Sequence, residues 1–127
     1  MKVTRFYATE SGESRFEEIE IPMNPRDDGS NALTSNLNPS PGFHLVELPA
    51  GRVSDWHHAP ARQIVTVLSG VVEVTTSDNQ KRQWRSGEQF FAEDLTGKGH
   101  LTAPIGGAAR LWIVRVPEKF DAKKWAV

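Results

Sequence analysis

Two adjacent histidines, His57 and His58, lie in the stretch DWHHAPARQIVTVLSG, directly before a segment with the apolar pattern of a buried β-strand. An imidazole in this place can bind a metal ion, move a proton, or serve as a hydrogen-bonded polar group at the strand entrance. Because side chains alternate between the faces of a strand, His57 and Ala59 share one face and His58 points away from it. Gln63 lies six residues after His57, and this even separation returns it to the same face. The spacing therefore predicts one site for His57 and Gln63, with His58 facing solvent unless a bulge turns it back.

A second stretch that could do chemistry is AEDLTGKGH, which carries two acids, a Gly-Lys-Gly turn and His100. Phe91 and Glu93 share a strand face, so Glu93 could face a pocket and move a proton together with His57 by general acid–base catalysis. The alternative is that Glu93 and Asp94 are exposed turn acids beside a lysine. A phosphate-binding loop is excluded, because the Gly-Lys pair lacks the preceding glycine and the following Ser or Thr that such a loop needs.

The charge and composition of the 127 residues narrow the functional classes. The sequence has 15 Lys and Arg against 16 Asp and Glu, without a basic stripe, so we expect no nucleic-acid partner. The first residues, MKVTRFYATESGE, lack the apolar run of a signal peptide or a membrane span, and the sequence contains no cysteine. We therefore expect a cytoplasmic protein with no membrane partner, no disulfides and no thiol chemistry.

Short β-rich runs separated by turn residues follow one another after Gly42. They are FHLVELPAG, QIVTVLSG, VVEVTTSDNQ, KRQWRSG, EQFFAED and RLWIVRV. This spacing predicts an all-β fold, an antiparallel sandwich or barrel with one core. Residues 64–68 are apolar on nearly both faces, which predicts a central strand. Only the end, EKFDAKKWAV, predicts a short C-terminal helix, whose Phe120 and Trp125 pack back onto the barrel.

The segment at residues 20–42 contains four prolines, repeated Asn and Ser, and too few apolar residues for helix or strand periodicity. Such a long irregular segment is unusual inside a compact domain, so we expect it to be mobile or to pack over a pocket mouth or a partner subunit. The predicted organisation is a single domain, with an irregular N-terminal arm at 1–42, a barrel at 43–117 and a tail at 118–127.

Two parts of the sequence resemble the motifs of the cupin family. The usual first motif is G(X)5HXH(X)3-4E(X)6G, and this sequence has Gly51, five residues, His57, five residues, Gln63, six residues and Gly70. Residues 87–100, GEQFFAEDLTGKGH, resemble the second motif, in which a glycine-led strand turns into a strand with the last metal-binding histidine. The segments WHHAPARQ, VLSG and AEDLTGKGH, in this order, also resemble a group of small bacterial cupin-domain proteins without an assigned reaction. The resemblance spans residues 43–116.

The resemblance implies a cupin-type double-stranded β-helix, or jelly-roll barrel, with a ligand pocket inside and often a homodimer. The usual site holds one divalent ion, such as iron, manganese, nickel or zinc, by three imidazoles and a carboxylate. His57, Gln63 and His100 are the counterparts in this sequence, whereas Ala59 replaces the second histidine and Glu93 replaces the usual proline of the second motif. Because Gln63 supplies a neutral amide in place of a carboxylate, this set predicts weak metal binding.

Several other residues are candidates for the pocket. Those predicted to line it are Trp56, His58, Phe91 and Trp112. Aromatic residues in a β-barrel more often belong to the core, so this prediction competes with a structural role. His44 shares a strand face with Val46, and it could be a further ligand or a structural residue.

The sequence supports three hypotheses for function. The first is a small-molecule-binding cupin that acts as a metal-dependent or acid–base enzyme, of isomerase, lyase or oxygenase type, on a small organic metabolite, with His57 and Glu93 as catalytic residues. The second is a non-catalytic, metal-free ligand-binding or sensing module with the same pocket. The third is an interaction subunit whose arm exchanges with a neighbour. We expect a homodimer, because exposed barrel edges commonly pair across a two-fold axis.

Overall fold

The computed structural model describes residues 1–127 as strands, turns and loops, with no helix. The strands are β1 (Lys2–Ala8), β2 (Ser14–Glu20), β3 (Asn24–Pro25), β4 (Leu33–Thr34), β5 (Gly42–Leu48), β6 (Gln63–Ser69), β7 (Val71–Thr76), β8 (Lys81–Arg85), β9 (Gln89–Glu93), β10 (His100–Pro104) and β11 (Ala109–Arg115). No helix with the length and apolar composition needed to cross a membrane is present.

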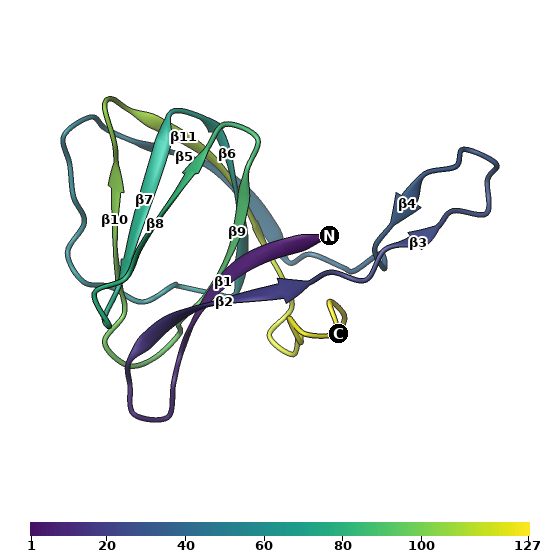
Figure 1. Ribbon diagram of the computed structural model, residues 1–127, viewed down its shortest axis with the longest axis horizontal. Coiled ribbons are helices and arrows are strands. Elements are labelled where there is room, and N and C mark those ends of the chain that lie inside the picture. The colour runs from purple at the N-terminus through teal and green to yellow at the C-terminus, as the bar shows by residue number, and fades with distance from the viewer.

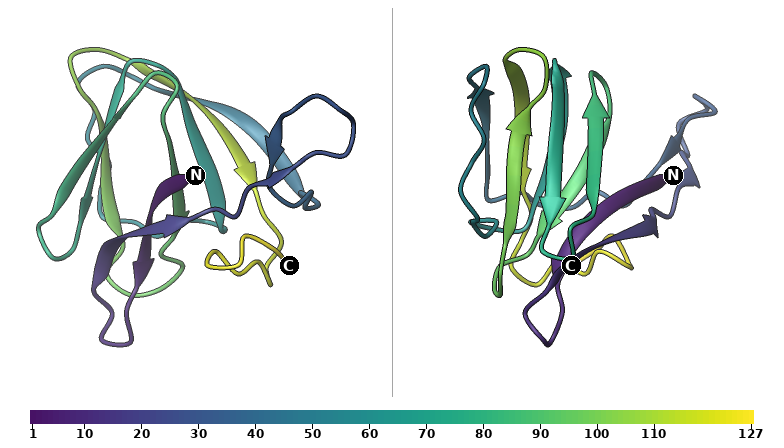
Figure 2. Two further views of the ribbon diagram at one scale, coloured as in Figure 1. Left: turned by 45° about the vertical axis from the view of Figure 1, so that its right-hand side comes forward. Right: turned by 60° about the vertical axis from the view of Figure 1, so that its left-hand side comes forward.

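Two sheets form the body of the molecule. The larger sheet has the strand order β2-β1-β9-β6-β11-β5, and the smaller has the order β10-β7-β8. Figure 1 and Figure 2 show them as two facing layers. The side chains buried between the layers form the barrel core: Phe6, Ala59, Val65, Val67, Val72, Val74, Trp84, Phe90, Ala92, Ala109, Leu111 and Ile113. The all-β prediction is confirmed.

The strands predicted after Gly42 are all present, as β5 to β9 and β11. β6 lies in the interior of the larger sheet, between β9 and β11, as its apolar composition predicts. Val65 and Val67 of β6 are buried inside the barrel, whereas Ile64 and Thr66 on its outer face are only partly buried. The alternation along β6 therefore separates an inner and an outer face of the larger sheet.

The irregular N-terminal arm is shorter than predicted. β1 and β2 form an antiparallel hairpin, and β1 also pairs in parallel with β9. β1 is buried on both faces, because Phe6 belongs to the barrel core and Val3 to a second cluster on the outer face. The parallel partner lies far along the chain, so no local pattern in residues 1–20 predicts this strand.

The projecting part of the arm is residues 22–41. Figure 1 shows its short hairpin, β3 and β4, standing away from the two sheets. The amide of Asn38 donates to the Trp125 carbonyl oxygen at 3.0 Å, and the Ser40 hydroxyl donates to the Arg115 carbonyl oxygen at 2.7 Å. Leu37 is fully exposed. None of these residues lines the barrel cavity described below, so the expected cover over a pocket mouth is not formed there.

The predicted C-terminal helix is wrong. Residues 118–127 form turns closed by a bridge between Asp121 and Ala126. Trp125 has a φ of 51°, which a right-handed helix does not allow. The expected packing is nevertheless present, since Phe120 and Trp125 both contact the ring of Phe91 on the outer face of the larger sheet. Burial of these rings, and not helix formation, determines the path of the tail.

Candidate functional site

A cavity of about 460 Å³ lies inside the barrel. One wall is apolar and comes mainly from the larger sheet: Val46, Leu48, Val65, Phe90, Ala92, Leu111 and Ile113. The other wall is polar and comes from β10 and from the segment that runs beside it: Ser54, Asp55, His57, His100 and Thr102. The exposed side chain of Arg52 lies at the rim. A cavity of this size and mixed lining is typical of sites for small organic ligands.

His57 and His100 meet at the polar wall. The N–H of His57 donates to the His100 carbonyl oxygen at 3.1 Å, and the N–H of His100 donates to the His57 carbonyl oxygen at 2.9 Å. Their ring centroids are 4.3 Å apart. Gly99 makes this approach possible, because a Cβ there would lie 2.4 Å from the His57 carbonyl oxygen and the φ of +75° disfavours other residues. The structure thus brings together two imidazoles from separate motifs.

Asp94 fixes the orientation and the tautomer of His100. This side chain is fully buried; its Oδ2 lies 2.6 Å from Nδ1 of His100, and its Oδ1 accepts the N–H of Ala59 at 3.2 Å. A carboxylate only accepts, so Nδ1 of His100 carries the hydrogen, and in the neutral ring Nε2 keeps its lone pair. The His100 ring also packs against Phe6, with 4.6 Å between centroids. Such an Asp–His pair is the arrangement that orients general bases and metal-binding histidines.

His57 is held in the same tautomer. Its Nδ1 lies 2.9 Å from the carbonyl oxygen of Asp55, and a carbonyl oxygen can only accept. Nδ1 therefore carries the hydrogen, and Nε2 has the lone pair. Since no protein group forms a hydrogen bond with Nε2 of His57 or His100, both atoms are available to a ligand in the cavity.

Gln63, the third member of the predicted set with His57 and His100, also lines the cavity. It is 8% exposed, and its Oε1 is the only buried side-chain nitrogen or oxygen in the chain without a hydrogen-bond partner. An unpaired buried polar group costs about 1–3 kcal/mol. A ligand or a bound water that reaches this atom would remove the cost.

The residues of the cavity do not fit the metal set that the resemblance implies. His57 and His100 could offer two Nε2 atoms, but the position of the carboxylate holds Gln63, and Asp94 already pairs with His100. No group of three or more His, Cys, Asp or Glu side chains that could hold a metal occurs in the structure. Zinc and non-haem iron sites generally use three or four strong protein ligands. Two imidazoles and an orphaned neutral amide fall short of that number.

Glu93 does not join the histidines. Its side chain lies on the outer face of the larger sheet, where Arg5 donates hydrogen bonds to both Glu93 and Glu17. Arg62 approaches the same carboxylate, with Nη1 3.7 Å from Oε2. Burial alone would lower the pKa of Arg5, but the hydrogen bonds to Glu93 and Glu17 outweigh it and raise that pKa above its ordinary value. The expected proton-moving pair of Glu93 and His57 is therefore not formed.

The other residues predicted to line the pocket also lie elsewhere. None of Trp56, His58, Phe91 and Trp112 lines the barrel cavity. His58 is exposed and its Nε2 meets the Gly97 carbonyl oxygen, which agrees with the strand alternation. Phe91 is buried beneath the C-terminal tail, and Trp112 is exposed beside Phe43 on the outer face. β9 and β11 present the opposite set of residues to the cavity, including Phe90 and Leu111.

Asp94 is the functional candidate that the sequence reasoning missed. Two consecutive acids at the end of a strand point to opposite faces, so an outward Glu93 implies an inward Asp94. This signal was present in AEDLTGKGH, but it becomes usable only when the orientation of one of the two acids is known. His44 on the edge strand β5 is exposed and does not line the cavity.

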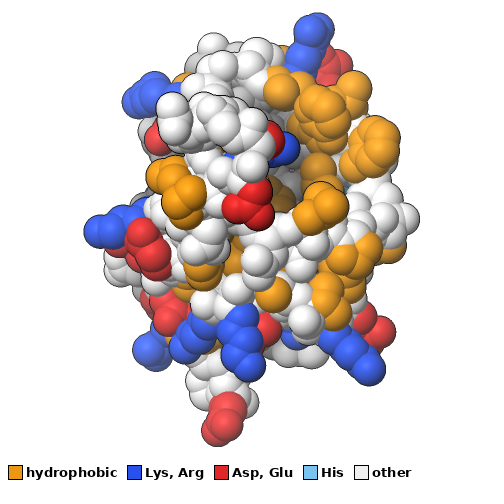
Figure 3. Space-filling model, turned by 90° about the vertical axis from the view of Figure 1, so that its right-hand side faces the viewer, with side chains coloured by type: hydrophobic (Ala, Val, Ile, Leu, Met, Phe, Trp, Pro, Cys, Tyr) orange, Lys and Arg blue, Asp and Glu red, His pale blue; other side chains and the backbone are white.

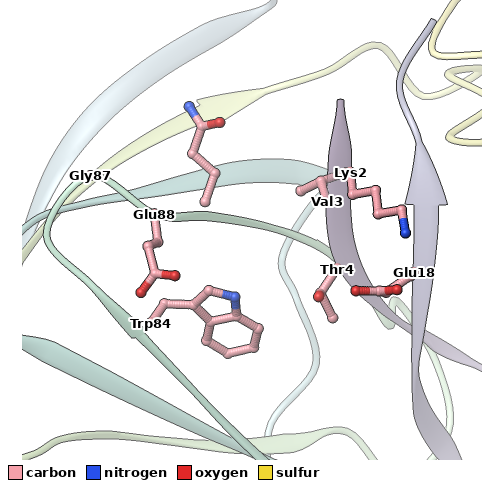
Figure 4. Close-up of a pocket in the computed structure, with 8 residues that line it drawn as sticks. Lys2, Val3, Thr4, Glu18, Trp84, Gly87 and Glu88 are labelled. Carbon is pink, nitrogen blue, oxygen red and sulfur yellow. The ribbon is translucent and has the colours of Figure 1, made fainter.

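A smaller hollow of about 290 Å³ lies at the start of β1. Figure 4 shows Lys2, Glu18 and Glu88 around it, with the ring of Trp84 along one side. It contains no histidine and no buried side-chain atom that lacks a partner. The barrel cavity therefore has the stronger claim to be the functional site.

Comparison with known proteins gives the fold. No protein-family model matches the sequence, and no curated protein sequence matches it. Among solved structures, an RmlC-like cupin protein with a double-stranded β-helix fold from Methanocaldococcus jannaschii is similar, with a TM-score of 0.52 and 16% identity over 79% of this chain and 93% of that chain. A protein from Salmonella typhimurium that carries the name ethanolamine utilization protein Q has a TM-score of 0.51 and 12% identity, over 94% of this chain and 98% of that chain. The chain has the cupin-type double-stranded β-helix fold.

Proposed function

We propose that the barrel cavity binds a small organic molecule and that His100 acts on it as a general base. The observation that carries this proposal is the hydrogen bond of 2.6 Å between Asp94 and His100 in the wall of the cavity. When Nε2 of His100 takes a proton from the ligand, the ring becomes an imidazolium, and the adjacent carboxylate stabilises its charge. Proton abstraction of this kind is a step of isomerases and lyases.

The rest of the cavity supports binding and orientation. His57 lies beside His100, and its Nε2 can accept a hydrogen bond from the same ligand. The apolar wall opposite the imidazoles holds the carbon skeleton by burial. Glu93 has no part in this proposal, because its carboxylate is used by Arg5 and Arg62 on the other face of the sheet.

A deuterium-exchange experiment tests the base even when the substrate is unidentified. Ligands are first selected from a mixture of small metabolites by ligand-observed NMR, and each is then incubated with the protein in D₂O. We expect at least one bound ligand to incorporate deuterium at a carbon. The His100→Gln variant should lose this exchange, whereas His58→Gln should retain it, because His58 lies outside the cavity. Exchange that persists in His100→Gln would contradict the assignment of the base.

A non-catalytic binding module is the second candidate. One observation favours it: both imidazoles are held in the same tautomer, so neither Nε2 offers a hydrogen to the ligand while His100 accepts one. Ligands that bind in the cavity without deuterium incorporation would support this candidate over the enzyme. Elemental analysis of protein purified without chelator belongs to the same test, because stoichiometric metal lost in both His57→Ala and His100→Ala would revive metal-dependent chemistry.

We also propose that the chain forms a homodimer, as expected from the exposed edge of β5. Phe43, Leu45 and Trp112 are exposed on the outer face of the sheet at this edge, and Figure 3 shows hydrophobic side chains gathered on one side of the face that carries the arm. Light scattering should give twice the mass of the chain, and Leu45→Lys should reduce it. Monomers alone at near-millimolar concentration would contradict the proposal.

A further inference from the structure

We propose that the cavity selects its ligand by hydrogen-bond donors: a small molecule with an apolar body and neighbouring hydroxyl or amine groups, in preference to a carboxylate or a phosphate. This inference rests on the proposed function and assigns the ligand class of the same site. It follows from the protonation pattern of the side chains that face the cavity.

The two imidazoles present lone pairs and not hydrogens. The Asp55 carbonyl oxygen fixes the hydrogen of His57 on Nδ1, and the Asp94 carboxylate fixes that of His100 in the same way. In the neutral rings, both Nε2 atoms are therefore hydrogen-bond acceptors. Because the ring centroids are 4.3 Å apart, donors on neighbouring atoms of one ligand, or the hydrogens of one ammonium group, can reach both imidazoles.

Gln63 adds a third acceptor. Its Oε1 is buried and has no partner in the protein, so a ligand donor would remove the energetic cost of this unpaired atom. The last torsion of a glutamine side chain is broad, which lets the carboxamide turn its oxygen toward a ligand. Together with Nε2 of His57 and of His100, this makes three acceptors for a donor-bearing ligand. The two imidazole nitrogens carry the discrimination against an oxyanion, because the carboxamide of Gln63 also has N–H donors.

The charges around the cavity do not favour an anion. Arg52 is the only cationic side chain in the lining, and it is exposed at the rim together with the acidic Asp55. Arg5 and Arg62, the cations of the outer face, do not line the cavity. The hydroxyls of Ser54 and Thr102 can donate or accept, and they do not discriminate between the ligand classes.

The apolar wall favours a hydrocarbon body for the ligand. Val46, Leu111 and Ile113 face the imidazoles across the cavity, and a saturated carbon ring or short chain placed there would be removed from water. A ligand of this class is amphipathic, with its donors at one edge of a hydrocarbon body. A highly polar sugar phosphate would leave this wall without a matching surface.

A matched series of cyclohexane derivatives tests the inference, since its members differ only in the polar groups. We would titrate cis-cyclohexane-1,2-diol, cyclohexylamine, cyclohexanol and cyclohexanecarboxylate into the whole protein at about pH 8, where free imidazole is neutral. The readout is the NMR signals of the His57 and His100 rings. The diol should bind about five- to tenfold more tightly than cyclohexanol, which corresponds to one additional hydrogen bond. The amine distinguishes an ammonium ligand from a diol, because both carry donors but only one is charged.

Two variants locate the effect. Gln63→Met keeps the length of the side chain and removes the amide, so the preference for the diol over cyclohexanol should fall to about twofold or less. His57→Phe keeps a ring and removes an acceptor. It should weaken the binding of the diol by about the same factor as Gln63→Met. The control, His58→Phe, changes the neighbouring histidine outside the cavity and should leave all four affinities unchanged.

The outcomes distinguish failure of the donor preference from failure of the proposed small-molecule binding. Tighter binding of the carboxylate than of the diol, with shifts in both histidine rings, would overturn the donor preference and leave a small-molecule site in place. Equal affinities for the diol and for cyclohexanol would also overturn it. If none of the four compounds shifts either ring, the proposed binding function and the donor preference fail together.

Discussion

Both faces of the larger sheet carry polar side chains, but those on the outer face have partners within the protein and some on the inner face do not. On the outer face, Arg5, Glu17, Glu93 and Arg62 form a cluster in which every carboxylate has a cationic partner. On the inner face, Gln63 has a buried oxygen without a partner, and the Nε2 atoms of His57 and His100 have no hydrogen bond to the protein. A satisfied cluster contributes to folding, whereas unsatisfied groups in a cavity lower stability and remain available for binding. The inner face is therefore the candidate for binding, because it carries a buried polar atom that no protein group satisfies.

Two consecutive acids in the sequence point to the two different faces. Glu93 and Asp94 follow one another, yet Glu93 points outward to Arg5 and Asp94 points inward to His100. Both acids are buried. Substitution of either acid should therefore lower the stability, but only substitution of Asp94 should change the position of the hydrogen on the His100 ring.

The largest effect is expected for Glu93→Ala on the outer face. It leaves the partly buried guanidinium of Arg5 without one of its two partners, and removal of one member of a largely buried ion pair costs about 3 kcal/mol. Urea unfolding should show this loss, while the tautomers of His57 and His100 stay unchanged. Glu10→Ala, at an exposed position, serves as the control. A loss below about 0.5 kcal/mol would mean that the outer cluster does not stabilise the fold.

A somewhat smaller loss is expected for Asp94→Asn on the inner face. The amide oxygen cannot accept from both Ala59 and His100 at once, so the charge-assisted hydrogen bond to His100 is lost or replaced by a weaker neutral one, at a cost of about 2 kcal/mol. In contrast to Glu93→Ala, this variant should also move the hydrogen of His100 to Nε2 or distribute it between both nitrogens. Unfolding by urea and the histidine NMR signals measure the two effects separately. An unchanged tautomer would contradict the orienting role of Asp94.

Gln63→Met should stabilise the ligand-free protein by about 1 kcal/mol, because it replaces an unpaired buried amide with an apolar side chain of similar size. Thermal unfolding checks this, with Gln80→Met as a control at an exposed turn. The same variant should bind donor ligands less tightly, so stability and binding change in opposite directions. A Gln63→Met protein that is less stable than the original would show that the amide supports the fold.

The smallest effect is expected at the surface, for Glu13→Gln. The hydrogen bond from Lys98, followed by that from Ser77, holds the pKa of Glu13 below its ordinary value. A carboxyl whose pKa is lower in the folded state contributes stability above its unfolded pKa, and this contribution is lost as the pH falls through the folded pKa. The urea midpoints of Glu13→Gln and the original protein should therefore differ slightly at neutral pH and converge in acid. A constant difference across this range would contradict the ionic origin.

Strands β5 to β9 and β11, and the central position of β6, were predictable because each of these strands has its own local pattern. The alternation in DWHHAPARQ also separates His57 from His58 correctly. β1 was not predictable in this way, because it is stabilised by parallel pairing with β9. The tail was mistaken for a helix, since the spacing of Phe120 and Trp125 is compatible with a helix or with turns that bury both rings. Local periodicity does not distinguish these two solutions.

The site was predictable only in part, for a reason of geometry. Two separated motifs indicate that His57 and His100 meet, but the direction of Glu93 and Asp94 depends on where β9 ends and the turn begins. A shift by one residue exchanges the inner and outer faces of a strand. The same exchange placed Phe91 and Trp112 in the predicted pocket, whereas Phe90 and Leu111 line it.

A long-range ¹H–¹⁵N NMR spectrum of the histidine rings in the ligand-free protein tests most directly whether Asp94 fixes the tautomer of His100. We predict that His100 is a fixed tautomer with hydrogen on Nδ1 and a lone pair on Nε2, and that Asp94→Asn abolishes this state. A His100 ring with its hydrogen on Nε2 in the original protein would contradict the claim, because the cavity would then face a donor in place of the base.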